Sequence, residues 1–426
     1  MKQGHLRWWI CSLLFASTVI NYIDRQTLAL LVPDLKRIYS WTNSDYAALG
    51  IAFRISYSIG QTLFGRVLDR VGSKRGLAGT VACYSAISIL TALANGFGSF
   101  IAFRFLLGFA ESGNWPGAAK VVSEWFPDRD RGLATAFYDS GSSIGGAIAP
   151  FIVFFVYAHF GLHATFVIPG LLGVIWLFVW RRVYALPENH PRITAAEKQI
   201  ILGDRQTATS SVAAIPVRKL LSLPQTWGTI VARSFTDPVW FFIADWFPIY
   251  LMSKGISVVG ALISVWIPFI AADLGNFFGG WLSGYFIGRG WPLLWARKAV
   301  VVLGGIGVLT IIPTVFTTEV LPITCLFAIA TFCYGCFTTI ANVLPSDLFP
   351  RNAVASVSGF GGTGASLGTI FAFFLIGRLT DARAGAGTHA FDPVIIIAGL
   401  IPFLGMILVL LLIRNTDRNA VETSMM

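Results

Sequence analysis

Several ionisable residues lie inside long apolar stretches in the first half of the sequence, among them Asp24, Arg25, Arg54, Arg104, Glu111 and Asp139. A charge at the centre of a bilayer costs about 2.5 to 3.5 kcal/mol on insertion scales, so such residues are expected to form functional sites or internal ion pairs. A guanidinium can bind a carboxylate through two parallel hydrogen bonds, and the proton affinity of a buried carboxyl group depends on its charged neighbours. These residue types indicate anion binding combined with proton exchange.

Arg25 is predicted to anchor the anion. Tyr22 precedes Arg25 by three residues, so a helix would place both side chains on one side. A tyrosine hydroxyl beside a guanidinium suits a carboxylate flanked by hydroxyl groups. Asp24 would point about 100° away from Arg25 on a helix and should therefore serve a different surface.

Asp24 and Glu111 are predicted to be the carboxyl groups that bind the proton. Arg104 and Glu111 would lie on one helix face about 10.5 Å apart along the axis, where each can engage an opposite charge on another helix. The alternative for Asp24 and Glu111 is a fixed ion pair between helices. For Arg54 and Asp139, a fixed ion pair and a functional role are equally favoured.

The second half carries fewer charges in its apolar runs. Arg233 and Asp237 are four residues apart, which predicts a local pair on one helix. Asp273 is equally consistent with packing and with gating, and Asp245 precedes Trp246 near the end of an apolar run.

The composition indicates which elements must position these residues. Of the 426 residues, 55% are hydrophobic and 12% charged, and the mean hydropathy is +0.70. Soluble domains carry about 25% charged residues, which argues against a soluble enzyme. Runs of about 20 apolar residues can cross a bilayer, and they occur at 8–31, 46–68, 76–96, 99–123, 133–157, 164–184, 225–251, 257–287, 291–316, 320–345, 353–378 and 391–414. The expected fold is an all-α polytopic membrane protein with twelve transmembrane helices, the first retained because no small-residue cleavage site follows it.

An internal repeat divides the chain. Glu124-Trp-Phe-Pro127 leading into Ser140-Gly-Ser-Ser-Ile-Gly145 recurs 223 residues later as Asp347-Leu-Phe-Pro350 leading into Thr363-Gly-Ala-Ser-Leu-Gly368. We expect six-helix bundles at 1–184 and 225–426, joined by a cytoplasmic linker at 185–224 in which the Thr194–Glu197 spacing predicts a short surface helix. Two such repeats around a central cavity are typical of secondary transporters.

Basic residues indicate the orientation. When the loops are assigned alternately to the two sides, most Lys and Arg residues fall on the side of the N-terminus. The positive-inside rule then places both termini and the 185–224 linker in the cytoplasm. This topology explains the net charge of +10, so no nucleic-acid partner is implied.

Cysteine and histidine patterns argue against other classes. Cys333 and Cys336 have the spacing of a redox or metal pair, but no second pair or nearby histidine completes a site. We expect no disulfide and no metal. The five histidines have no ligand spacing, which disfavours a membrane-embedded enzyme or a receptor. A passive channel is disfavoured because no ring of like charges or repeated filter segment is present.

The loop after the second run resembles the cytoplasmic signature of the major facilitator superfamily. It reads Gly65-Arg-Val-Leu-Asp69-Arg70-Val-Gly72-Ser-Lys74-Arg75. Asp69 can face a neighbouring helix N-terminus and pair with basic residues, and the resemblance implies a gating role for Asp69 and Arg70.

Two further motifs resemble the anion:cation symporters of that superfamily, particularly bacterial hexuronate transporters and the related aldonate carriers. They are Asn21-Tyr22-Ile-Asp24-Arg25 and Arg104-Phe-Leu-Leu-Gly108-Phe-Ala-Glu111-Ser-Gly113-Asn114-Trp115-Pro116. The resemblance implies proton-coupled uptake of a sugar-acid monoanion, such as glucuronate or galacturonate, by a monomer in the bacterial cytoplasmic membrane, with a co-transported proton and no other cofactor. It assigns Asp24 and Glu111 to proton coupling. The residues expected to contact the substrate are Tyr22, Arg25, Asn114, Trp115, Ser142 and Thr363.

Three positions depart from the family pattern. Arg54 stands where a neutral Gln is more usual, Asp139 interrupts an expected Phe-Asn-Ser-Gly sequence, and Asp245 replaces an apolar or aromatic residue. Arg54 would form a charge-compensating ion pair with Asp139 or Asp245, or these residues would widen the substrate specificity toward a different polyhydroxy acid. We therefore group them with Arg104 as ion-pair or gating residues. Another polyhydroxy or aromatic carboxylate carrier and an anion exchanger remain alternatives.

Overall fold

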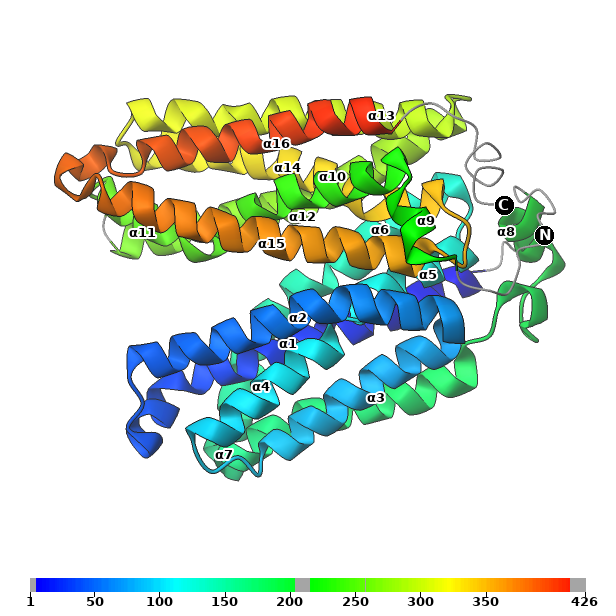
Figure 1. Cartoon of the computed structure of the whole chain (residues 1–426), viewed down its shortest axis with the longest axis horizontal. Helices are drawn as coiled ribbons and strands as arrows, with labels where there is room; N and C mark the ends of the chain where they lie inside the picture. The colour runs from blue at the N-terminus through cyan, green and yellow to red at the C-terminus, as the bar shows by residue number, and fades with distance from the viewer. Residues whose placement is uncertain (1–4, 204–214, 257, 414–426) are drawn as a thin grey trace. The chain divides into compact units, whose positions relative to one another are not determined.

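The computed structural model describes residues 5–203, 215–256 and 258–413, and within these ranges every regular element is a helix (Figure 1). The side chains of Asn43, Ala244, Asp245, 258–263, Val265 and Ala384 lie outside the described part of the chain. Contacts divide the chain into two compact units. Unit 1 comprises 1–127, 137–214 and 350–360, and unit 2 comprises 128–136, 215–349 and 361–426.

Unit 1 is built mainly from the first part of the chain. Its helices are α1 (Leu6–Tyr39), α2 (Asn43–Val71), α3 (Ser73–Thr91), α4 (Phe97–Glu111), α5 (Asn114–Trp125), α7 (Gly141–Val183), η1 (Pro187–Asn189) and α8 (Ala195–Gly203). Helix α7 packs against α1 and α3, while α2 packs against α4. A capping box at Thr42 and Asp45 begins α2, because each residue satisfies a backbone N–H of the other.

Helix α7 contains two helical segments separated by a break at Gly161. Gly161 has φ of 79° and ψ of 179°, a conformation that glycine adopts without steric cost. The break separates the two apolar runs predicted at 133–157 and 164–184. The first segment lies very close to α1, since a Cβ atom at Gly145 would be 2.7 Å from the Val19 carbonyl oxygen.

Residues 99–123, expected as one helix, form two. Helix α4 ends at Glu111 and α5 begins at Asn114. Pro116 has no N–H to donate to the carbonyl four residues earlier, which accounts for the interruption. A Cβ at Gly113 would be 2.5 Å from Thr80 Oγ1, so the small residue lets the break approach α3.

Unit 2 is built mainly from the second part of the chain. Its elements are α9 (Val217–Leu221), α10 (Pro224–Asp245), α11 (Phe247–Ser253), α12 (Val258–Gly288), α13 (Leu293–Gly307), η2 (Val308–Phe316), α14 (Val320–Leu348), η3 (Ala384–His389) and α16 (Asp392–Leu412). Helix α12 packs on α14, and α10 on α16. An aromatic core includes Phe247, Tyr250 and Phe327, all fully buried.

Two helices are shared by the units along the chain. Helix α6 (Asp128–Asp139) begins in unit 2 and its last residues belong to unit 1, whereas α15 (Val354–Asp381) begins in unit 1 and continues in unit 2 from Gly361. Two segments belong to the unit formed mainly by the other part of the chain. They are 128–136, which begins directly after Pro127, and 350–360, which begins at Pro350, and these prolines are the last residues of the repeated motifs. The contact-based units therefore differ from the predicted domains at these two places, and they also divide the predicted linker, since 185–203 belong to unit 1 and 215–224 to unit 2.

The linker contains the helix expected from the Thr194–Glu197 spacing. Helix α8 begins directly after Thr194, whose hydroxyl accepts from the Glu197 N–H at 3.2 Å. The Glu197 carboxylate does not complete the expected capping box. It accepts instead from the backbone N–H groups of Leu6 and Arg7, at 3.3 and 3.0 Å, and so caps the N-terminus of α1.

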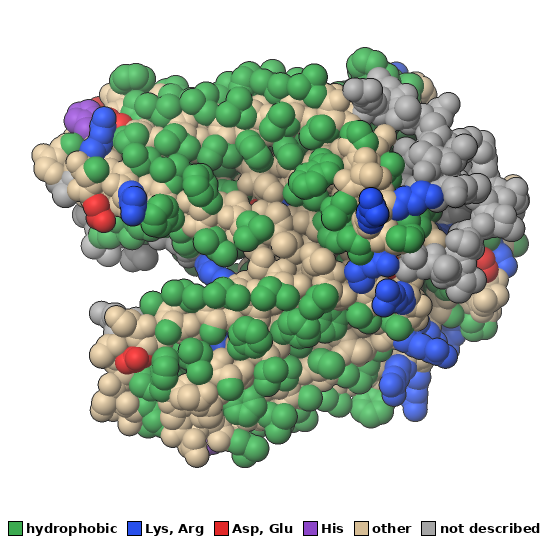
Figure 2. Space-filling model, in the orientation of Figure 1, with side chains coloured by type: hydrophobic (Ala, Val, Ile, Leu, Met, Phe, Trp, Pro, Cys, Tyr) green, Lys and Arg blue, Asp and Glu red, His purple; other side chains and the backbone are tan. Residues whose placement is uncertain are grey.

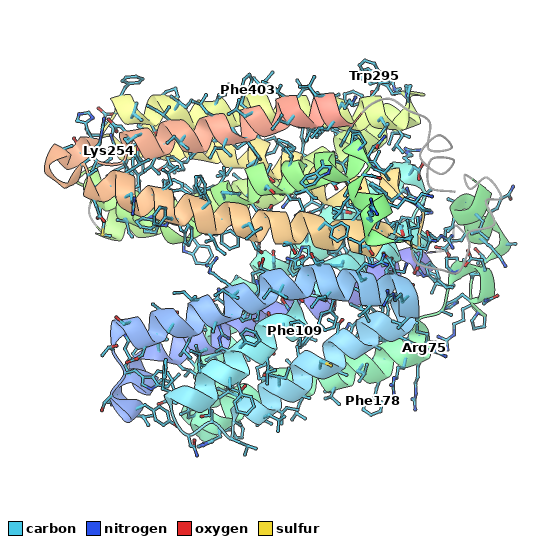
Figure 3. All side chains as sticks on the ribbon, in the orientation of Figure 1. Arg75, Phe109, Phe178, Lys254, Trp295 and Phe403 are labelled. Atoms are coloured by element: carbon cyan, nitrogen blue, oxygen red, sulfur yellow. The ribbon has the colours of Figure 1, made fainter. Side chains whose placement is uncertain are left out.

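Large hydrophobic side chains remain exposed along the helices of both units. Figure 2 shows this apolar covering, and Figure 3 shows Phe178 projecting away from α7, where its side chain is 65% exposed. Exposed basic residues gather where α2 meets α3, among them Arg70, Lys74 and Arg75. Among the residues that the structure describes, six segments are long and apolar enough to cross a membrane: Leu6–Tyr39, Asp128–Val183, Leu293–Phe316, Val320–Leu348, Val354–Asp381 and Gly385–Leu412.

Candidate functional site

An ion pair between Arg25 of α1 and Glu111 of α4 is the centre of the candidate site. Nε and Nη2 of Arg25 both donate to Oε2 of Glu111, at 3.2 and 3.0 Å. The Glu111 side chain is fully buried, whereas 22% of the Arg25 side chain is exposed. The predicted anion anchor and a predicted proton-binding carboxyl group are therefore direct partners.

Aromatic rings surround the Arg25 guanidinium. Its Cζ lies 5.0 Å from the ring centre of Tyr22, 5.0 Å from Phe53 and 4.9 Å from Tyr57. Such contacts hold a cation by electrostatic attraction to the ring faces. Tyr22 was expected beside Arg25, but Phe53 and Tyr57 of α2 were not identified. Their spacing of four residues would have shown a shared helix face, although not that this face contacts α1.

Trp115 and Asp139 extend the site from Tyr22. The Trp115 ring centre is 6.1 Å from that of Tyr22, and its Nε1 donates to Asp139 Oδ1 at 3.0 Å. Ser142 donates to the Asp139 backbone carbonyl at 2.7 Å. Three positions predicted separately thus form one continuous set of contacts in unit 1.

Asn114 is held by α1. Its Oδ1 accepts from Ser17 at 3.2 Å and its Nδ2 donates to Thr18 Oγ1 at 3.3 Å. The residue is 1% exposed, so its amide connects α5 to α1 in this structure. A substrate contact for Asn114 remains a prediction.

Asp24 is not hydrogen-bonded to Arg25 or Glu111 in the described residues. The Ser88 hydroxyl of α3 donates to Asp24 Oδ1, and Asp24 Oδ2 finds no hydrogen-bond partner in the described residues. Arg104 is also buried, with its Cζ 4.9 Å from the Phe53 ring centre. Asp24 and Arg104 are close enough to interact electrostatically.

Asp69 binds the first turn of α15 within unit 1. Its carboxylate accepts from the backbone N–H groups of Ala355 and Ser356, at 3.3 and 2.7 Å, and from the Ser356 hydroxyl at 2.6 Å. Lys120 Nζ donates to the same carboxylate at 2.9 Å and to the backbone carbonyl of Arg351. An anion at a helix N-terminus is stabilised by the unpaired N–H groups there.

Unit 2 contains a buried charge cluster that sequence reasoning missed. Asp347 accepts from Arg297 Nε at 2.8 Å and from Arg131 Nη1 at 3.1 Å, and Arg297 also donates to Ser283 at 2.5 Å. Asp347 occupies the repeat position of Glu124, which marked it as notable. Nothing in the sequence identified its two arginine partners.

The remaining predicted site residues lie on α2, α10 and α15. Arg54 is half-buried on α2 and Arg70 is exposed at its end. Thr363 belongs to unit 2, and the side chain of Asp245 lies outside the described residues. Arg233 and Asp237 form the predicted local pair at 2.9 Å.

None of the five cysteines, all of which lie in the described ranges, takes part in a disulfide bond. Within the described ranges, no group of three His, Cys, Asp or Glu residues is placed to hold a metal ion.

The fold and the buried ionisable site define a multi-pass membrane transporter. Residues 14–373 match the Major Facilitator Superfamily. The chain belongs to this superfamily. It is not an enzyme, in agreement with the relatives and solved structures described below, which are transporters.

Named relatives match almost the whole chain. The hexuronate transporter of Escherichia coli (strain K12) is 30% identical over 423 residues, which cover 97% of this chain and 95% of the relative. The D-galactonate transporter of Escherichia coli O6:H1 is 27% identical, with 98% of each chain covered. The solved structure of the proton:xylose symporter XylE bound to 6-bromo-6-deoxy-D-glucose has a TM-score of 0.71 at 15% identity, covering 95% of both chains. That structure supports the fold alone.

Proposed function

We propose that this protein is a proton-coupled symporter that imports an organic monoanion, most simply a hexuronate, by alternating access. The observation that carries the proposal is the pairing of Arg25 with Glu111. The hexuronate transporter of Escherichia coli supports the substrate class. The D-galactonate relative favours an aldonate as the second candidate.

Coupling follows from competition between two carboxylates for one guanidinium. Arg25 directs Nε and Nη2 at Glu111, and a substrate carboxylate that binds this edge of the guanidinium competes for the same two donors. Protonation of Glu111 removes its negative charge and weakens the pair. The guanidinium then becomes available to the substrate, so anion binding and proton binding favour one another.

The aromatic and polar neighbours of Arg25 suit a hydroxylated substrate. Tyr22 and Tyr57 place phenol groups beside the anion anchor, and Trp115 holds Asp139 near the same region. Phenol and carboxylate oxygens can accept hydrogen bonds from sugar hydroxyl groups. We assign substrate contacts to Tyr22, Arg25 and Trp115, with Ser142 and Thr363 as further proposed contacts.

We further propose the full arrangement expected from the sequence. Twelve transmembrane helices form two six-helix repeats, 1–184 and 225–426, in the bacterial cytoplasmic membrane with both termini and the linker inside. The protein acts as a monomer, with no cofactor other than the transported proton. Asp69 and Lys120 hold the first turn of α15, and release of this turn is proposed to accompany transport.

Uptake by purified protein in proteoliposomes tests this function. Labelled glucuronate, galacturonate and galactonate are offered with an inward proton gradient, with the gradient collapsed by a protonophore, and in liposomes without protein. Gradient-dependent accumulation of a sugar acid is expected. Exchange that is independent of the proton gradient would support an anion exchanger instead. The absence of both uptake and counterflow for all three sugar acids would refute the proposal.

A further inference from the structure

Ser88 lies between two hydrogen-bond acceptors on different helices. Its hydroxyl reaches Oδ1 of Asp24 on α1 and, at 2.9 Å, the backbone carbonyl of Phe166 on α7. Ser88 is 1% exposed and Asp24 is 3% exposed, so water does not compete freely for these contacts. A hydroxyl group has a single proton to donate, so a strong hydrogen bond to one acceptor weakens the bond to the other.

Ser88 is the only hydrogen-bond partner of the Asp24 carboxyl group within the described residues. Asp24 Oδ2 is buried and has no partner there. The serine is held firmly because α3 and α7 are in close contact. A Cβ at Gly170 would lie 2.7 Å from the Ser85 carbonyl oxygen, and a Cβ at Gly173 would lie 1.9 Å from Ser85 Oγ.

The direction of the Ser88 hydrogen bonds depends on the proton of Asp24. An ionised carboxylate only accepts, so the hydroxyl must donate to it. A protonated carboxyl group can donate to Ser88 Oγ, and the serine proton can then turn to the Phe166 carbonyl, which has a second lone pair available.

We propose that Ser88 is a positioning residue that transmits the protonation state of Asp24 to α7. When Asp24 binds a proton, a new O–H bond forms on its carboxyl group, and the Ser88 O–H bond rotates without breaking. Protonation thereby reverses the Ser88–Asp24 hydrogen bond and directs the Ser88 proton to the Phe166 carbonyl, which strengthens the contact between α3 and α7. This inference rests on the proposed function in that Asp24 takes part in proton coupling.

Other ionisable groups face the Asp24 carboxyl group. Arg104 and Glu111 of α4 interact with it electrostatically, and Tyr84 of α3 lies one turn before Ser88 with its buried hydroxyl unpartnered in the described residues. Arg25 is its neighbour on α1. Helix α7 contributes the Phe166 carbonyl. The test must therefore separate the effect of Ser88 from that of these charges.

Three variants of the full-length protein in lipid make this separation. Ser88→Ala removes the hydroxyl, and Ser88→Thr retains one. Thr91→Ala is the matched control, because Thr91 is also buried on α3 but its hydroxyl donates to the Ile87 carbonyl of its own helix at 2.8 Å. Infrared difference spectroscopy over a pH titration follows the C=O stretch of the protonated carboxyl group, and Asp24→Asn identifies the band of Asp24.

We expect Ser88→Ala to change the frequency of the Asp24 band and to move its titration midpoint upward by about one pH unit. Ser88→Ala removes a charge-assisted hydrogen bond from the ionised carboxylate and a neutral hydrogen bond from the protonated carboxyl group. The charge-assisted bond is the stronger of the two by about a factor of ten in equilibrium constant, so the ionised form loses more. Ser88→Thr and Thr91→Ala should match the wild type. In the Asp24→Asn background, Ser88→Ala should have no further effect on the spectrum.

An unchanged band and midpoint in Ser88→Ala would overturn the inference, as would the absence of any band that Asp24→Asn removes. Because the spectrum needs no substrate, it separates this inference from the proposed function. If the protein transports no sugar acid but the Asp24 band responds to Ser88, the proposed function fails and the role of Ser88 stands.

Discussion

Replacing Arg25 by Lys should weaken sugar-acid binding about ten- to one-hundred-fold. In the structure, two separate nitrogens of the guanidinium, Nε and Nη2, reach one carboxylate oxygen of Glu111. Lysine keeps the positive charge but presents a single ammonium group in place of the planar fork. Losing one charge-assisted hydrogen bond costs about 1.5 to 3 kcal/mol, and each 1.4 kcal/mol corresponds to a tenfold change in affinity.

The measurement is the ligand-dependent rise in thermal stability of the purified protein, since a ligand that binds only the folded state raises the apparent unfolding temperature. Glucuronate is titrated against the wild type, Arg25→Lys and Arg37→Lys. Arg37 is a suitable control because its side chain is 78% exposed and pairs locally with Asp34. Wild-type affinity in Arg25→Lys would show that the anion binds elsewhere, and an equal loss in Arg37→Lys would show a nonspecific charge effect.

Three other substitutions test separate parts of the structure. Glu111→Gln should impair accumulation driven by a proton gradient while retaining counterflow, because the side chain can no longer exchange a proton; uphill uptake at the wild-type level would remove Glu111 from the coupling path. Asp69→Asn should slow transport severalfold with little change in affinity, since it weakens the contacts to the first turn of α15; lost affinity with normal turnover would contradict that role. Gly145→Ala should destabilise the protein by about 1 to 3 kcal/mol, because its Cβ would overlap an α1 carbonyl, whereas Gly146→Ala meets no atom within 4 Å. Equal thermal stability of the two alanine variants would argue against that packing.

Much of the candidate site was visible in the sequence because charged residues are rare in apolar runs. Asp24, Arg25 and Glu111 were identified in this way, and the three-residue spacing of Tyr22 and Arg25 placed both on one side of α1. The sequence left open whether Glu111 pairs with Arg25 or acts independently. The structure pairs them across a separation of 86 residues, which no local pattern specifies.

Other features required the packed helices. Ser88 resembles any small residue of a transmembrane segment until α1 and α7 are placed beside α3. Asn114 is a predicted substrate contact, and only the structure shows that its amide also bonds two hydroxyls of α1. Glu197 has the spacing of a capping box, yet its carboxylate accepts from the backbone N–H groups of Leu6 and Arg7 at the start of α1.

By itself, the sequence determined the membrane class, the internal repeat and the types of the buried ionisable groups, because hydrophobicity and charge are local properties that add along the chain. Only the tertiary structure decided the partners: Arg25 with Glu111, Asp69 with the first turn of α15, and Arg131 and Arg297 with Asp347. The physical reason is that a pairing depends on how each helix is rotated and where it is broken. Those quantities are set by side-chain packing between segments far apart in the chain.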